Sequence, residues 1–373
     1  MADISYSEKI TVEAAGGMSM FASEASVLTQ ISGDKSRTNS TTTMKSRLAG
    51  MMGGNGNSGS IVRLDKALTW NLLPDKKQYT ETTFAQARAQ MEEAMAAMSD
   101  ARASAGSGTG LPVSEENCQW TEGDLEVEHP SGKEKVAGIK TSKHIVRLRQ
   151  SCEDPKTHKT CDITWVMETW LAKKVPAEKE ARKFQLDYAK AMGLDDVARQ
   201  VQGPGRGLLS MFAGNWDDVV DKLGEMKGYP LRTVMQMGIG GEQCTTASGK
   251  PIAMDEVWAD ASTAAYNAAL DQAGYEAGSA VGRAAGESLG SSVGGSIGGA
   301  AVGAAAGELI GGLTGMFKKK KTAEKPAETQ ANPAGQQVTA FRITTEVTDW
   351  SEITIPAARF EEPAGWTRVT SAP

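Results

Sequence analysis

Histidine and aromatic residues are scarce in this sequence: three histidines and 6% aromatic residues occur among 373 positions. Catalytic and zinc sites commonly use such side chains at close spacing, and no Cys-x-x-Cys pair or His-Glu-x-x-His motif occurs. The phosphate-binding pattern Gly-x4-Gly-Lys-Ser/Thr is also absent. We therefore expect a protein that is not an enzyme and has no catalytic residues, metal site or cofactor.

An excess of positive charge is missing as well. The chain contains 40 Lys and Arg residues against 46 Asp and Glu residues, which gives a net charge of −6. A nucleic-acid-binding face needs basic residues to neutralise the phosphates. This balance argues against a nucleic-acid partner.

The residues that could carry acid–base chemistry have simpler interpretations. Asp195-Asp196 and Asp217-Asp218 lie near the starts of predicted helices, where acidic side chains stabilise the helix dipole. The histidines, His129, His144 and His158, fall in or beside turns and strands. We expect these histidines to lie at the surface.

The four cysteines favour disulfide bonds. Cys152 and Cys161 flank a polar turn between two strand-like runs, so a disulfide between them would close the open end of a hairpin. Cys118 and Cys244 would then form the second pair, although four cysteines allow three pairings. Zinc is the alternative, but only His158 lies close to this pair. Disulfides favour an oxidising compartment. Since the first residues lack the pattern of a signal peptide, that interpretation implies a leader that was removed.

The first part of the chain predicts antiparallel strands followed by a helix. Apolar residues alternate from Ile4 to Val12, as in a strand with one buried face. Strands at 26–32 and 35–44 meet at Gly33-Asp34, and three more are expected at 61–64, 67–72 and 78–82. A helix over 83–103 should carry an apolar stripe of Phe84, Ala87, Met91, Ala94, Met95 and Met98.

The rest of the chain predicts a second β region, helices and a final return to strands. The second β region covers 118–171, and its last strand places Ile163, Trp165 and Met167 on one face. Helices should follow Pro176 and occupy 208–226, and strand patterns recur at 231–237 and from Phe341 onward. We therefore predict an α+β fold in which covering helices lie on a curled antiparallel sheet. The predicted parts are a sheet domain (1–254), a glycine-rich helical insertion (255–321), a linker (322–335) and C-terminal strands that complete the sheet domain (336–373).

Glycines recur every fourth position in the insertion. The first series comprises Gly274, Gly278, Gly282, Gly286, Gly290, Gly294 and Gly298, and a second series comprises Gly295, Gly299, Gly303, Gly307, Gly311 and Gly315. Small residues four apart let helices approach closely, so a glycine-zipper hairpin is expected. Residues 289–317 contain one charge, Glu308, and eight Leu, Ile, Val and Phe residues, so a lone helix would insert poorly into a bilayer. Membrane contact, packing on protein and a flexible arm all stay open.

Several segments resemble a known family. Residues Gln30–Thr38, Ile61–Asp65, Thr69–Tyr79 and Ile353–Trp366 look like an exported bacterial family of unknown function. That family is similar to the LolA/LppX-like periplasmic lipoprotein carriers. The resemblance covers 1–82, 118–176 and 336–369, and the glycine series departs from it. It implies an open half-barrel around helices, a concave face that holds acyl chains, and a periplasmic or cell-envelope location.

These patterns together predict a non-enzymatic envelope protein that binds lipid or a lipidated, hydrophobic partner. The candidate ligand-binding residues are Trp70, Phe84, Met91, Met95, Met98, Trp165 and Met167. Methionine adapts to varied apolar partners, although the same stripe could simply complete the core. The alternative is a structural or assembly protein whose glycine zipper drives homo-oligomerisation or membrane insertion.

Overall fold

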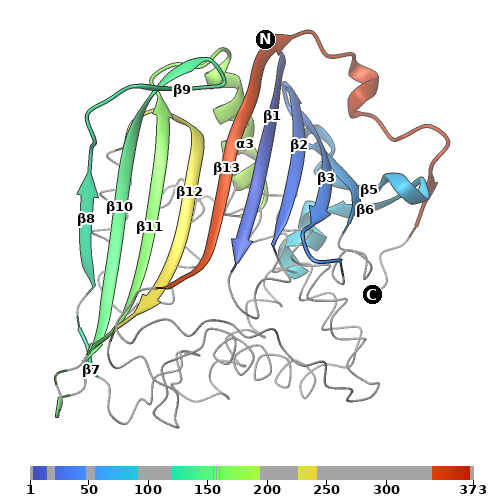
Figure 1. The fold of residues 1–373 in the computed structure, drawn as a ribbon. Coiled ribbons are helices and arrows are strands. Elements are labelled where there is room, and N and C mark those ends of the chain that lie inside the picture. The colour runs from blue at the N-terminus through green and yellow to red at the C-terminus, as the bar shows by residue number, and fades with distance from the viewer. Residues whose placement is uncertain are drawn as a thin grey trace, which may run out of the picture.

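One large sheet dominates the molecule (Figure 1). The computed structural model describes residues 3–14, 22–47, 55–90, 119–121, 123–153, 155–156, 158, 160–193, 226–241 and 338–369. These residues form a fourteen-stranded sheet with the order β14-β6-β5-β4-β3-β2-β1-β13-β12-β11-β10-β7, and β8 and β9 also pair with β10. The pairs are antiparallel, except that β14 runs parallel to β6. The predicted antiparallel sheet is confirmed.

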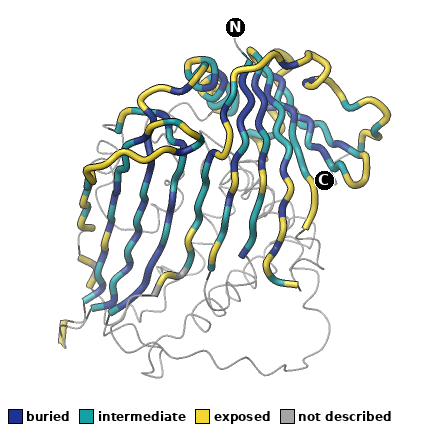
Figure 2. Tube along the Cα trace, turned by 45° about the horizontal axis from the view of Figure 1, so that its top comes forward, coloured by how far each residue is buried: buried dark blue, intermediate teal, exposed yellow. Residues whose placement is uncertain are grey.

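The strands have the following bounds: β1 Asp3–Ala14, β2 Ser23–Ser32, β3 Lys35–Met44, β4 Gly56–Arg63, β5 Leu68–Leu73, β6 Gln78–Thr83, β7 Gln119–Trp120, β8 Asp124–Glu128, β9 Glu134–Val136, β10 Ile139–Glu153, β11 Thr160–Ala172, β12 Tyr229–Gly240, β13 Val338–Ile353 and β14 Thr367–Arg368. Figures 1 and 2 show that the sheet twists strongly, so that β5 and β6 turn away from the direction of β10 and β11.

The short connections follow the turn chemistry of the sequence. The β2–β3 hairpin turns at Gly33, whose φ of 59° suits a residue without a Cβ atom. One-turn 3-10 helices, η3 (Leu64–Lys66) and η4 (Pro74–Lys76), link β4 to β5 and β5 to β6. The predicted strands at the N-terminus and the hairpin at Gly33-Asp34 are confirmed.

The C-terminal strand β13 joins the two sides of the sheet. It pairs with β1 on one side and with β12 on the other. Strands β1–β6 and β7–β12 are therefore neighbours only through a strand that comes late in the sequence.

Two helices lie beside this sheet in the described part of the chain. Helix α3 (Glu178–Ala191) starts just after Pro176, as the sequence predicts, and Gly193, which has a φ of 71°, lies two residues beyond its end. Residues 84–90 form the described portion of the helix predicted over 83–103. No described helix is long and apolar enough to cross a bilayer.

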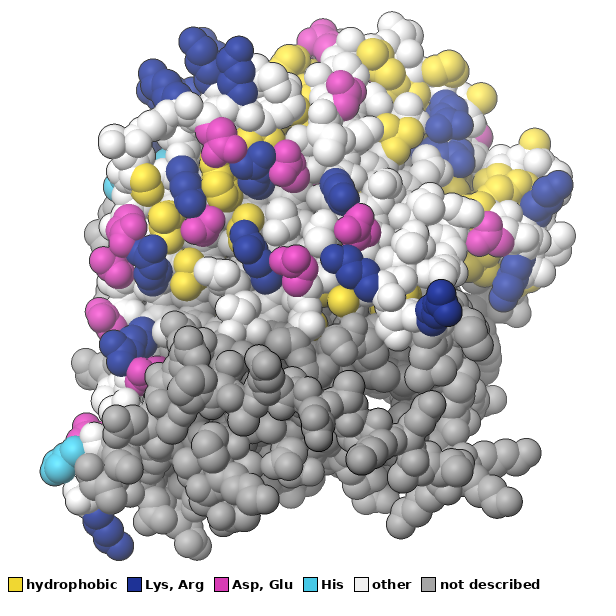
Figure 3. All heavy atoms as spheres, in the orientation of Figure 1, with side chains coloured by type: hydrophobic (Ala, Val, Ile, Leu, Met, Phe, Trp, Pro, Cys, Tyr) yellow, Lys and Arg dark blue, Asp and Glu magenta, His cyan; other side chains and the backbone are white. Residues whose placement is uncertain are grey.

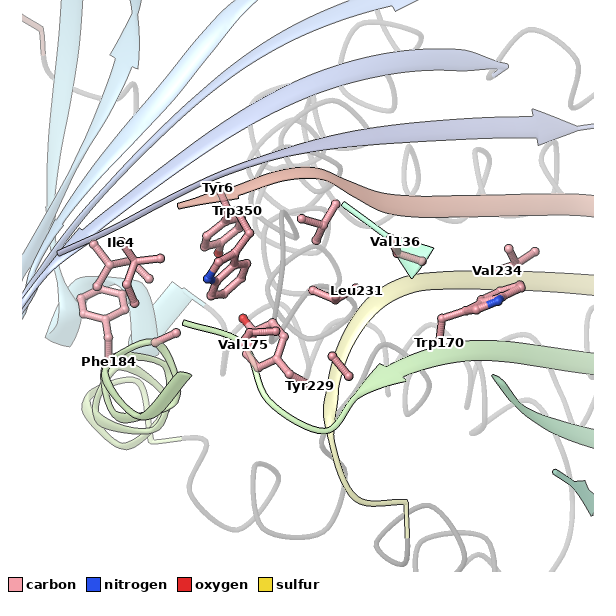
Figure 4. Close-up of a cluster of buried hydrophobic side chains, with 14 residues drawn as sticks. Ile4, Tyr6, Val136, Trp170, Val175, Phe184, Tyr229, Leu231, Val234 and Trp350 are labelled. Carbon is pink, nitrogen blue, oxygen red and sulfur yellow. The ribbon is translucent and has the colours of Figure 1, made fainter. Parts of the chain in front are cut away.

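The register assigns every strand residue to one of two faces, because successive side chains point to opposite sides. We call the face that carries Ile4, Tyr6 and Ile10 of β1 the inner face, and the opposite one the outer face. Helix α3 packs on the inner face, behind the sheet in Figure 1. Tyr6 stacks on Trp350 with ring centroids 4.9 Å apart, and Tyr229 meets Trp350 edge-on (Figure 4).

The outer face has its own core at the other end of the sheet. Ile61, Trp70 and Tyr79 of β4–β6 are buried there beneath the C-terminal segment, which contributes Ile355 and Phe360. Phe360 ends the short helix η6 (Ala357–Phe360). The apolar face of the sheet therefore changes between its two ends.

Over β10–β13 the outer face carries charges of both signs. Figure 3 shows basic and acidic side chains interspersed on this face. Cross-strand ion pairs explain the pattern, including Lys143–Glu168 at 3.1 Å and Arg149–Asp162 at 2.6 Å. Arg232 bridges Glu134 and Glu346, and Trp170 lies against the cations of Arg232 and Lys143. A face covered with paired charges protects the exposed side of the sheet from nonspecific association.

Candidate functional site

Two of the predicted ligand-binding residues lie together on the inner face. Trp165 and Met167 are buried in β11, two residues apart. On the neighbouring strand β12, Met237 pairs with Trp165 and Met235 pairs with Met167. On the other side, β10 places Leu148 and Val146 opposite the same two residues. The inner face of β10–β12 is therefore an apolar surface rich in methionine.

Trp70 does not belong to this surface. Its register runs through Ile61, Arg37 and Gln30 to Ser5, which puts it on the outer face. There its indole Nε1 donates a hydrogen bond to Glu81, 2.9 Å away. This corrects the expectation that Trp70 shares the inner face with Trp165 and Met167. The pattern in each strand was right, but the face of a strand depends on every pairing between it and β11.

Phe84 lies at the edge of the sheet, against α3. It is buried, and its ring meets Tyr188 edge-on at 5.7 Å. Beside it is an open hollow of about 480 Å³, lined by Lys66, Ala67, Thr83, Phe84, Ala85, Arg88 and Ala191. Arg88 donates a hydrogen bond to the Ala191 carbonyl oxygen, 2.6 Å away, and so ties the 84–90 helix to α3. Phe84 therefore helps to dock two helices.

Several predicted residues lie outside the described residues. They are Met91, Met95, Met98, Cys118, Cys244, Asp195, Asp196, Asp217, Asp218 and both glycine series, Gly274 to Gly298 and Gly295 to Gly315. Their predicted roles stay predictions.

The cysteines that the structure describes are oxidised. Cys152 and Cys161 are buried directly opposite each other in β10 and β11, and each takes part in a disulfide bond. Because Cys118 and Cys244 lie outside the described residues, the pairing of the four cysteines stays a prediction.

Glu8 is the unexpected feature of the inner face. Its side chain continues the alternation of Ile4, Tyr6 and Ile10, and only 2% of the residue is exposed. Neither carboxyl oxygen has a hydrogen-bond partner in the part of the chain that the structure describes. Burial raises the pKa of Glu8 well above the ordinary carboxyl value. Burial therefore favours the neutral acid.

The strands around Glu8 surround it with apolar and aromatic groups. Val27 and Val347 are its cross-strand partners on β2 and β13. A β-bulge begins beside it, because Ser7 pairs with Asp349 while Glu8 pairs with Val347. The Glu8 carboxylate contributes to raising the pKa of both Tyr6 and Tyr229, although burial is the main cause for each. Glu8 therefore lies near the aromatic group of Tyr6, Trp350 and Tyr229.

A row of polar side chains crosses the inner face next to this site. We call it the polar row, and its members occupy consecutive ladder positions on β2–β6: Thr29, Thr38, Ser60, Asn71 and Thr80. Thr29 pairs with Tyr6, so the row continues directly from β1. Among the described residues, no side-chain hydrogen bond engages Ser60, Asn71 or Thr80. The inner-face positions of β1–β6 contain no Lys or Arg, and Glu8 is their only charged residue.

Other buried polar atoms on the inner face also lack partners among the described residues. They are Ser40 Oγ, His144 Nδ1, Trp165 Nε1 and Thr169 Oγ1. His144 was expected at the surface, but its ring is half-buried against His129, with ring centroids 4.6 Å apart. Burial, and then the charge of His129, lowers the pKa of His144. His158, by contrast, is exposed and pairs with Glu153 at 2.7 Å.

The unpartnered atoms have one thing in common. By register, Glu8, Ser40, Trp165, Thr169 and His144 all point to the inner face. A buried polar group without a partner destabilises the fold by about 1–3 kcal/mol, so native structures contain few of them. Their concentration on one face makes the inner face the candidate functional site. The sequence contained one signal of this, a glutamate within the apolar alternation of β1.

Other kinds of site find no support in the described residues, where no group of three or more His, Cys, Asp or Glu side chains is arranged to hold a metal ion. Comparison of the chain with family models, curated proteins and solved structures gave no match.

Proposed function

We propose that this protein binds an apolar ligand, a lipid or a lipidated partner, on the inner face of its sheet and catalyses no reaction. One observation carries the proposal: buried polar atoms without partners among the described residues lie on a face that is apolar over β10–β12 and polar over β3–β6. An amphiphilic ligand would match both properties of that face.

The apolar part of this face supports an interaction with acyl chains. Met235, Met237, Met167 and Trp165 adjoin one another on β11 and β12. Methionine is unbranched and polarisable, so it adapts to ligands of varied shape. Each CH₂ group buried there would contribute about 0.8 kcal/mol to binding.

The polar part supports an interaction with a head group. Glu8 and Ser40 are buried without partners, and the polar row lies beside them. A ligand that gives these atoms hydrogen bonds would relieve the unfavourable free energy of leaving them unsatisfied.

The LolA-like half-barrel and the envelope location belong to the same proposal. A large, twisted, open antiparallel sheet with helices on one face is compatible with a curled carrier sheet. The disulfide bonds of Cys152 and Cys161 support an oxidising compartment.

The test begins with the protein as purified from cells. It is extracted with organic solvent, and the extract is analysed for lipids by mass spectrometry. We expect a bound lipid in the wild type and clearly less in Met167→Gln, because a polar amide would then lie on the apolar surface.

Val166→Gln is the matched control. Val166 is the neighbouring half-buried residue, and its side chain points to the outer face. It should leave the lipid content unchanged. Finding no lipid in the wild type, or equal losses in the two variants, would contradict the proposal.

A further inference from the structure

The charge pattern of the inner face narrows the class of ligand. Within β1–β6, Glu8 is the single charged residue on this face, and neither Lys nor Arg accompanies it. An anionic phosphate or carboxylate group would therefore find no countercharge there. A cationic group would meet the one acidic side chain.

The aromatic neighbours of Glu8 favour the same class. Tyr6 precedes Glu8 by one position on the inner face, and it stacks on Trp350. Tyr229 completes the group at 5.0 Å from Trp350. A carboxylate beside aromatic rings is suited to an ammonium ion, because the rings attract cations as well.

The hydroxyl groups nearby favour an ammonium that still carries N–H bonds. Ser40 lies in the same row as Glu8, two strands away, and its Oγ has no partner in the described chain. Thr29 lies in the next row, beside Tyr6. A primary ammonium has three donors, so it can bond the carboxylate and hydroxyl oxygens at once.

We propose that Glu8 recognises a primary ammonium group on the apolar ligand. This inference rests on the proposed function, since the apolar part of the ligand would lie on the methionine surface. Among the described residues, the titratable groups that interact with Glu8 are the phenols of Tyr6 and Tyr229. Arg182 of α3 is engaged elsewhere: it bonds Glu178 at 2.7 Å and stacks over the Tyr229 ring.

The inference includes a proton transfer. Both carboxyl oxygens of Glu8 are buried without a partner among the described residues, which favours the protonated acid in the unliganded protein, whereas a ligand ammonium is already protonated at pH 7. When the ammonium binds, Glu8 releases its proton to solvent and the resulting carboxylate pairs with the ligand. Binding should therefore release up to about one proton per ligand.

The experiment uses delipidated full-length protein and four probes with the same ten-carbon chain: decylamine, decyltrimethylammonium, decanol and decanoate. Calorimetric titrations at pH 7 give the affinities, and repeating them in two buffers of different ionisation enthalpy counts the protons. We expect decylamine to bind at least about tenfold tighter than decanol, since a charge-assisted hydrogen bond contributes about 1.5–3 kcal/mol. Decyltrimethylammonium should fall between them, because it has charge but no N–H donor.

Glu8→Gln should reduce decylamine binding to the decanol level and abolish proton release, while decanol binding stays unchanged. Glu13→Gln is the matched control, because Glu13 is an exposed carboxylate on the outer face of the same strand. It should behave as the wild type.

Proton counting in the wild type needs no variant, so a folding defect could not hide the answer. If decylamine binds no better than decanol, or releases no proton, the inference about Glu8 fails while apolar binding stands. If none of the four probes binds, the proposed function fails with it.

Discussion

Strands β4–β6 bury Ile61, Trp70 and Tyr79 on the outer face, beneath the C-terminal segment, whereas Trp165 and Met167 of β11 and Met235 and Met237 of β12 are buried on the inner face. The consequence appears on the inner face of β3–β6, where most side chains are Ser, Thr or Asn rather than large apolar residues. A single sheet thereby presents an apolar surface and a polar surface side by side on one face.

The two faces also differ in whether their buried ionisable residue has hydrogen-bond partners. On the outer face, Arg63 is buried but fully engaged, with Asp65 at 2.6 Å, Glu361 at 2.7 Å and the Phe360 carbonyl oxygen at 3.1 Å. On the inner face, Glu8 is equally buried and has no partner among the described residues. Removing one partner from a buried ion pair destabilises a fold, whereas a buried acid that already lacks a partner marks a place where stability was given up.

The largest expected effect is a loss of stability after a cavity is made in one of the two cores. Phe360→Ala should lower the free energy of unfolding by about 3–5 kcal/mol, because it leaves a cavity in the outer core. Hydrogen exchange should show lost protection first in β5 and β6. Phe184→Ala on α3 is the counterpart, and it should expose β1 first. Loss of protection in the same strands for both variants would mean that the cores are not independent.

A smaller effect is expected at the ion cluster of the outer core. Arg63→Met should destabilise the protein by about 1–3 kcal/mol, since it leaves the Phe360 carbonyl oxygen without its side-chain donor. Hydrogen bonds from Arg63 lower the pKa of both Asp65 and Glu361. Their stabilising contribution is thus present above the ordinary carboxyl pKa and lost as the pH falls through the lowered pKa. Urea unfolding from pH 6 to pH 2 should show a shallower acid loss in Arg63→Met; parallel curves would contradict this account.

Glu8 should show the opposite pH dependence. Because burial raises its native pKa, the folded state keeps a proton that the unfolded chain loses above the ordinary carboxyl pKa. Wild-type stability therefore falls as pH rises between the two pKa values, by at most about 1.4 kcal/mol per pH unit. Glu8→Gln removes that decline, so the variant should gain on the wild type as the pH rises above the ordinary carboxyl pKa.

Urea unfolding of both proteins at several pH values measures this difference. Glu13→Gln, on the outer face of the same strand, should follow the wild type throughout. A constant difference between Glu8→Gln and wild type at all pH values would show that Glu8 is ionised or solvated in the folded protein.

Local features of this fold could be predicted from the sequence, because each is decided by residues that are close in the chain. The alternation in β1, the turn at Gly33 and the limits of α3 at Pro176 and Gly193 are of this kind. Strand β4 was predicted to start later, since its first residues, Gly56-Asn-Ser-Gly-Ser, look like a loop. They form a strand that pairs with β3, and those of them that point to the inner face lie beside Ser and Thr side chains of β3.

The relation between distant strands could not be predicted in the same way. Placing Trp70 and Trp165 on opposite faces requires the register of every strand pair between β5 and β11, including bulges beside Ser7, Met237 and Trp170. A shift of one residue in any of these strand pairings would place the side chain on the opposite face of the sheet. The sequence did show that 35–44 is almost entirely Ser, Thr and Asn, but not that these side chains would adjoin a buried carboxyl group.

The most direct test of the account is to locate a bound acyl chain. Methyl groups of Met and Ile would be isotopically labelled, and NMR spectra recorded with a long-chain alcohol that carries a nitroxide on its chain. We predict strong broadening for Met235, Met237 and Ile10 on the inner face, and none for Ile61 in the outer core. Broadening of Ile61, or no selective broadening at all, would contradict the claim that the inner face is the binding surface.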